Sequence, residues 1–176
     1  MRSDEALYEA LCNGDVRAFD ELYARHSRPL FAFVKRMLSD VHEAEDVLNE
    51  SFLTLVRQRD AASKAESLRA WLFTVARNQC LNRLRSQRRG ARAVDAASER
   101  DEAHPSPEQA LEQRVTADKL RLAVEKLPAP MAELYQLRAR GLAYDEIASV
   151  LQVPVGTVKS RVHEMVRRLR EEIAER

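Results

Sequence analysis

The side chains that could do chemistry in this chain are mostly basic, and they are gathered in two blocks. From Arg57 to Arg92 ten Lys and Arg residues stand beside two acids, and from Val155 to Arg170 five stand beside Glu164 alone. The acidic stretch from Asp95 to Glu112 separates the blocks, so the formal net charge of +1 conceals their segregation. Two positive blocks of this kind predict two contacts with one polyanion.

The patterns that carry catalytic or metal chemistry are not found in the sequence. There is no glycine-rich phosphate loop, no pair of metal ligands at suitable spacing and no nucleophile motif. Cys12 and Cys80 have no Cys or His at ligand spacing, and we expect both to be reduced thiols. We therefore expect a protein without catalytic residues, metal or cofactor.

The second basic block falls in a segment that has the pattern of a helix-turn-helix. A helix is expected over residues 144–151, a turn at Val153-Pro154 and a second helix over residues 155–173. Ile147 and Leu151 would point towards the core. The apolar stripe expected in the second helix comprises Val158, Val162, Met165 or Val166, and Leu169. The opposite face, which would present side chains to base edges of DNA, carries Lys159, Ser160, His163, Glu164 and Arg167. Thr157, near the helix start, is placed to contact phosphate.

Helical patterns also cover the first half of the chain. A helix capped by Asp15 is expected to run to about Leu38, with Pro29 interrupting or restarting it. The next helix, over about residues 43–55, has one apolar or small stripe and an acidic face elsewhere. That stripe comprises Ala44, Val47, Leu48, Ser51, Phe52 and Leu55.

A further helix, from Ser67 to Arg89, is expected to bury one side and to turn its basic residues outwards. The predicted buried side comprises Leu68, Trp71, Leu72, Val75, Ala76, Cys80 or Gln79, and Leu84. An aromatic ring can stack on an unpaired base, but Trp71 lies on this apolar side. We therefore expect it, like Phe31, Phe33 and Phe52, to belong to the core.

Residues 91–107 lose the apolar pattern and predict a flexible acidic linker, because such a composition buries too little surface to offset its ordering entropy. The predicted fold is all-α, with a helical bundle over residues 1–90 and a helix-turn-helix domain over residues 108–176. No apolar run approaches the roughly 20 residues that span a bilayer, and the N-terminus lacks the core of a signal peptide. We expect a cytoplasmic protein with no membrane insertion.

Three segments resemble, in order and spacing, motifs of the ECF (extracytoplasmic function) sigma factors of bacterial RNA polymerase. Residues 44–53 are similar to the polymerase-clamp helix of that family, and residues 68–78 are similar to its promoter-melting helix. Residues 142–148 and 153–163 resemble its C-terminal promoter-reading domain. The resemblance implies a non-catalytic subunit that binds core RNA polymerase and guides it to promoter DNA.

The resemblance also implies roles for residues of the first half. Asp46, Asn49 and Glu50 would dock on the clamp helices of the β′ subunit, with Asn49 standing where the family usually has Gln. The basic helix would bind the −10 element, with Arg77 and Asn78 at its upstream edge. Its phosphate contacts would come from Arg83, Arg85, Arg88 and Arg89. The loop at about residues 60–66 would capture a flipped base.

In the second half, the resemblance assigns the −35 element to Lys159, Ser160, Arg161, His163 and Glu164. Family members often have a basic residue where Glu164 stands, and this carboxylate could accept from a cytosine amino group or repel phosphate. The β flap would be a second contact on the polymerase. The family resemblance further implies control by an anti-sigma factor.

A competing hypothesis is a homodimeric DNA-binding regulator that acts without polymerase. It explains the helix-turn-helix but gives no role to the acidic helix at 43–55 or to the first basic block. It also predicts tight binding of the free protein to duplex DNA, whereas a sigma factor should need core enzyme.

Overall fold

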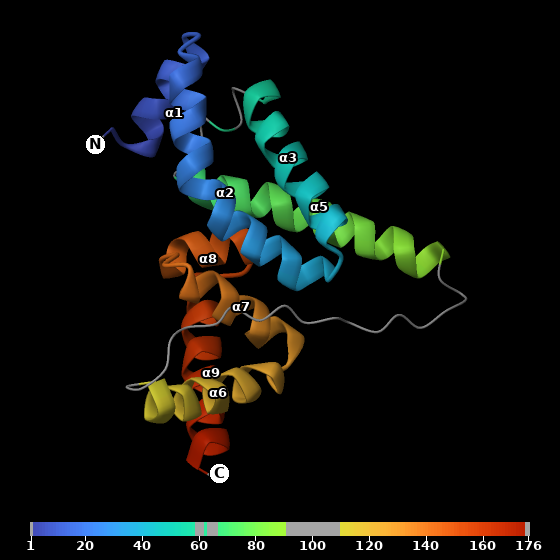
Figure 1. Cartoon of the computed structure of the whole chain (residues 1–176), viewed down its shortest axis with the longest axis vertical. Coiled ribbons are helices and arrows are strands. Elements are labelled where there is room, and N and C mark those ends of the chain that lie inside the picture. The colour runs from blue at the N-terminus through green and yellow to red at the C-terminus, as the bar shows by residue number, and fades with distance from the viewer. Residues whose placement is uncertain (1, 59–61, 63–66, 91–109, 175–176) are drawn as a thin grey trace. The chain divides into compact units, whose positions relative to one another are not determined.

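The computed structural model describes residues 2–58, 62, 67–90 and 110–174. All regular secondary structure in these ranges is helical, and the helices form two compact units, one up to Gly90 and one from Ala110 onward (Figure 1). The predicted all-α fold is confirmed. No helix in the described part is long and apolar enough to cross a membrane. The predicted linker, residues 91–107, lies outside the described residues.

The first unit consists of α1 (Asp4–Cys12), α2 (Val16–Leu38), α3 (Val41–Arg57) and α5 (Leu68–Gly90). Helix α2 contacts α1, α3 and α5, and α3 also packs against α5. Asp15 caps α2 as predicted, because its carboxylate accepts from the Arg17 amide at 3.1 Å. Asp40 caps α3 in the same way, accepting from the Glu43 amide at 2.8 Å.

Pro29 does not interrupt α2, which is a single helix of 23 residues. The interruption or restart predicted at this position is therefore wrong. A proline inside a helix costs about 3 kcal/mol, because it lacks an N–H and crowds the preceding turn. Leu22, His26, Leu30 and Phe33 are buried on both sides of this point in the sequence. Tertiary packing along the helix outweighs the local cost.

Helix α1 was not predicted from the sequence. The Asp4 carboxylate accepts a hydrogen bond from Arg25 at 2.8 Å and lies 2.7 Å from Nε2 of the buried His26. The Tyr8 hydroxyl donates to the Leu55 carbonyl at 3.2 Å. These contacts tie a short helix to α2 and α3 through residues that are far apart in the sequence, which local periodicity does not reveal.

The core of the first unit confirms one predicted stripe and corrects the other. All six predicted positions of α3 are buried. In α5, Trp71 is only partly buried, and the fully buried aromatic residue is Phe73, whose ring lies 5.2 Å from that of Phe33 between centroids. Phe31 is also only partly buried. The core assignments of Trp71 and Phe31 are therefore wrong, whereas those of Phe33 and Phe52 are confirmed.

The correction at Trp71 has a geometric reason. The buried positions of α5 are Leu68, Ala70, Leu72, Phe73, Ala76 and Cys80. At 3.6 residues per turn most of these positions centre on the side of Leu72 and Ala76. That rotation places Trp71 away from the centre of the stripe, and Val75 and Leu84 are likewise only partly buried.

The second unit consists of α6 (Ala110–Glu125), α7 (Ala129–Ala139), α8 (Tyr144–Leu151) and α9 (Val155–Ala174). Helices α6 and α7 both pack against α9. Ile147 and Leu151 are buried as predicted, and Gln152 turns the chain between α8 and α9 with a φ of 56°. In α9 the stripe runs through Val158, Met165 and Leu169.

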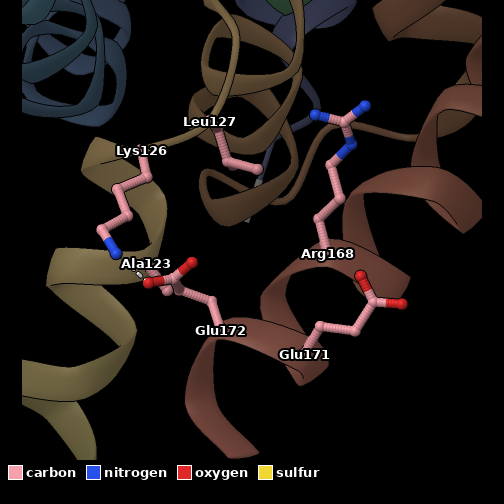
Figure 2. Close-up of a pocket in the computed structure, with 6 residues that line it drawn as sticks. All are labelled: Ala123, Lys126, Leu127, Arg168, Glu171 and Glu172. Carbon is pink, nitrogen blue, oxygen red and sulfur yellow. Dashed lines mark hydrogen bonds and ion pairs between the residues drawn. The ribbon is translucent and has the colours of Figure 1, made fainter. Parts of the chain in front are cut away.

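Helices α6 and α9 also meet through charged side chains. Lys126 forms an ion pair with Glu172, beside a pocket of about 190 Å³ whose apolar lining comes from Ala123 and Leu127 (Figure 2). Arg168 and Glu171 line the α9 side of the same pocket. The side of α9 that faces α6 is thus covered by contacts within the second unit.

The Phe33–Phe73 contact should be essential to the first unit. Phe33→Ala should lower the free energy of unfolding by about 3–5 kcal/mol, because Phe33 is 1% exposed and its loss leaves a cavity. Leu53→Ala should change it by less than about 0.5 kcal/mol, since Leu53 is 46% exposed. Urea unfolding followed by the fluorescence of Trp71, the single tryptophan, would measure both. Equal effects of the two substitutions would contradict this packing.

Candidate polymerase and DNA interfaces

The outer side of α3 carries the three residues expected to contact a partner. Asp46, Asn49 and Glu50 are all exposed, because the six buried positions of the helix lie on its other side. Leu53 and Val56 are exposed next to them at 46% and 36%. This helix therefore presents carboxylates together with apolar surface, which suits a partner helix that carries arginine and apolar side chains.

The acidic part of α3 is also held to the basic helix α5. The Gln87 amide donates to both Glu43 carboxylate oxygens at 2.8 and 2.9 Å, and Arg83 lies 3.7 Å from Asp46. Further along, the hydroxyl of Ser51 lies 3.4 Å from Oε1 of Gln79. Residue numbers rise on α3 while they fall on α5, so the two helices run antiparallel. These contacts set the acidic face beside the basic helix.

The residues expected to bind the −10 element differ in exposure along α5. Asn78, Arg85, Arg88 and Arg89 are exposed, whereas Arg77 and Arg83 are partly buried. Arg89 donates to the Arg85 carbonyl at 3.3 Å. The structure thus brings Arg85, Arg88 and Arg89 together near the C-terminal end of α5, where the helix dipole stabilises positive charge. Within the loop expected to capture a base, only Ala62 is described, and it is buried.

Helix α9 turns most of its expected DNA-contacting residues outwards. Lys159, Ser160, His163 and Arg167 are exposed, and Thr157, Arg161 and Glu164 are partly exposed. The expected choice between Met165 and Val166 is settled by burial, because Met165 is buried and Val166 is only partly so. The side opposite Val158 and Met165 is therefore open over the first turns of the helix.

Sequence reasoning missed an ionic network on this open side. Glu164 accepts from Arg167 at 2.7 and 2.9 Å and from Arg168 at 2.7 Å. Hydrogen bonds from Arg167 and then Arg168 lower the pKa of Glu164 to about 2. Arg167 also donates to Glu171 at 2.6 Å, and its hydrogen bonds to the Glu164 and Glu171 carboxylates raise its pKa. The spacing of three and four residues was the available signal.

Among the described residues, no group of three or more His, Cys, Asp and Glu side chains could hold a metal ion. Cys12 is partly buried and Cys80 is buried, and neither forms a disulfide.

Two family models match this chain. Residues 22–90 match sigma-70 region 2, and residues 117–169 match sigma-70 region 4. The first match covers most of α2, with α3 and α5, and the second covers the end of α6 through most of α9.

Similar proteins and structures give the same assignment. The RNA polymerase sigma-H factor of Pseudomonas aeruginosa is 31% identical over 92% of this chain and 89% of that protein. The ECF RNA polymerase sigma factor SigL of Mycobacterium tuberculosis is 34% identical over 85% of both. The solved structure of the sigma factor RpoE in complex with the anti-sigma factor NepR, from Bartonella quintana, aligns with a TM-score of 0.67 at 26% identity, over 89% of this chain and 96% of that one. CnrH in complex with the cytosolic domain of CnrY aligns with the same TM-score at 22% identity, over 98% and 97%. The chain therefore belongs to the ECF sigma factors, the promoter-specificity subunits of bacterial RNA polymerase.

Proposed function

We propose that this sigma factor divides its work between the two helical units. The unit up to Gly90 binds core RNA polymerase and opens the −10 element, and the unit from Ala110 onward reads the −35 element. The observation that carries the proposal is that α3 and α9 each bury an apolar side and present most of the predicted contact residues on the other. The protein has no catalytic role of its own and works in the cytoplasm.

The polymerase contact is the exposed face of α3 formed by Asp46, Asn49 and Glu50, extended by Leu53. Carboxylates paired with arginine on the β′ clamp helices give charge-assisted hydrogen bonds, and Leu53 gives apolar contact. The side chain of Asn49 is one methylene shorter than the usual Gln, so we assign the main energy to the two acids. The second unit contacts the β flap.

The proposed DNA contacts lie along α5 and on the first turns of α9. On α5, Arg77 and Asn78 contact the upstream edge of the −10 element, and Arg83, Arg85, Arg88 and Arg89 contact phosphates, which adds salt-sensitive binding. On α9, Lys159, Ser160 and His163 face the bases of the −35 element from the first turns of the recognition helix. Thr157, Arg161, Glu164 and Arg167 border this reading surface.

An anti-sigma factor controls the activity. RpoE, which shares the fold and 26% of its residues with this chain, was solved in complex with an anti-sigma factor. The polar exposed face of α3 and the exposed basic residues of α5 and α9 are surfaces that such a partner can cover. An anti-sigma factor that covered α3 would block polymerase binding, and one that covered α9 would block promoter reading.

Run-off transcription with core polymerase tests the function directly. We expect a defined transcript only when this protein is added, and weak binding of the free protein to the same duplex. A protein that binds the intact duplex tightly and leaves core polymerase inactive would instead be a regulator of the homodimeric class.

Charge reversal on α3 should weaken polymerase binding. Asp46→Lys with Glu50→Lys should raise the dissociation constant for core enzyme about tenfold or more, because like charges then face each other across the interface. A control with the same charge change, Glu9→Lys with Asp20→Lys, alters exposed residues of α1 and α2 and should bind normally. Competition binding and thermal melting of each variant would measure the effect. Normal affinity of the first variant would remove α3 from the interface.

Removal of two side chains from α9 should weaken promoter reading. Lys159→Ala with His163→Ala should lower transcription from promoters that depend on the −35 element about tenfold, since each base contact is worth about 1–3 kcal/mol. Arg170→Ala, exposed about two turns further along α9, should have little effect because the first turns of such a helix enter the groove. An undiminished transcript from the double variant would show that the register of α9 on DNA is wrong.

A further inference from the structure

The outward side of α9 carries different kinds of side chain in its first turns and in its later turns. The positions opposite Val158, Met165 and Leu169 begin with Ser160 and His163 and continue with Glu164, Arg167 and Glu171. The first pair is proposed to read DNA. In the following three, Arg167 donates hydrogen bonds to the carboxylates of both Glu164 and Glu171.

The bonding leaves little of the network available to another ligand. Oε1 of Glu164 accepts from Nη2 of Arg167 and Nε of Arg168, both at 2.7 Å, and Oε2 accepts from Nε of Arg167 at 2.9 Å. Nη1 of Arg167 donates to Glu171 at 2.6 Å. All three nitrogens of the Arg167 guanidinium are therefore engaged with carboxylates. Arg168 lies at the flank, where it lines the pocket against α6 and extends away from Glu172 (Figure 2).

Glu164 carries its negative charge at the neutral pH at which DNA binding is measured. Because the hydrogen bonds from Arg167 and Arg168 hold the pKa of Glu164 at about 2, its carboxylate remains ionised at neutral pH. Exposed ion pairs of this kind contribute little to folding stability. Their main effect is therefore on the charge that the helix presents to a phosphate backbone.

We propose that Glu164 withholds Arg167 from the DNA backbone and thereby limits the sequence-independent part of DNA binding by α9. To bind a phosphate, Arg167 would have to give up charge-assisted hydrogen bonds to two carboxylates, and Glu164 would stand beside the phosphate as a like charge. Recognition then depends on Lys159, Ser160 and His163, and the affinity of the free protein for arbitrary duplex stays low. This inference rests on the proposed role of α9 as the recognition helix.

The other role open to Glu164, acceptance of a hydrogen bond from a cytosine amino group, would require the base to share this carboxylate with Arg167 and Arg168. Both carboxylate oxygens are already acceptors within the helix. The two roles predict opposite results when the charge is removed. A cytosine contact would be lost from the promoter duplex alone, whereas release of Arg167 would strengthen binding to every duplex.

The test measures how the affinity of the full chain for short duplexes depends on salt, with one duplex that contains the −35 element and one scrambled duplex. Glu164→Gln should make the slope of log K against log salt steeper by about 0.9, the value for one added phosphate contact. Affinity between 50 and 200 mM salt should then fall about three- to fourfold more than for the parent chain. The change should be equal on both duplexes, and Glu164→Gln with Glu171→Gln should match or exceed it.

Glu172→Gln is the matched control, because it removes one negative charge from the same helix at a residue paired with Lys126 of α6. Its slope should stay at the parent value. Equal slopes for the Glu164 and Glu172 variants, or an unchanged slope for both, would overturn the proposal, as would weaker binding of the Glu164 variant to the promoter duplex alone. Run-off transcription by the parent chain with core polymerase is a separate arm. Failure there contradicts the sigma function while leaving the salt comparison interpretable.

Discussion

Burial of one side of α3 is the constraint on which the rest of the first unit depends. Its six buried positions pack against α2 and α5, and the same rotation of the helix turns Asp46, Asn49 and Glu50 to the surface. Contacts from Glu43 and Asp46 to α5 then fix where the basic helix lies. A rotated α3 would expose apolar core, lose its carboxylate face and shift α5 at the same time, so docking and DNA contact share one packing arrangement.

The parts of the fold that were predictable from sequence are those encoded in helical periodicity. The stripe from Ala44 to Leu55 and the stripe through Val158 and Leu169 were predicted because each side chain packs on the same side as its neighbours one turn away. The errors at Pro29 and Trp71 arose where contacts between distant segments decide the outcome. Helix α1 was missed for the same reason, since its partners lie on α2 and α3.

The positions of the candidate surfaces could be predicted from the sequence, but the pairing of their charged side chains could not. Counting charges along the sequence identified both basic blocks and the acidic face of α3. It could not show that Arg83 lies beside Asp46 or that Arg167 is held by Glu164 and Glu171. Such pairing follows from side-chain geometry in the folded helices. The formal charge of each block therefore exceeds the charge that remains free for phosphate.

The bond between Asp4 and the buried His26 has a consequence for any shortened form of the protein. A chain that began at Val16 would keep every helix named in the sigma-70 matches. It would nevertheless remove the Asp4 carboxylate, which contacts the imidazole of His26 and the guanidinium of Arg25, so these polar groups of α2 would lose that compensation. Truncations that remove α1 would therefore disturb the domain interior, although none of the residues proposed to contact polymerase or DNA lies on α1.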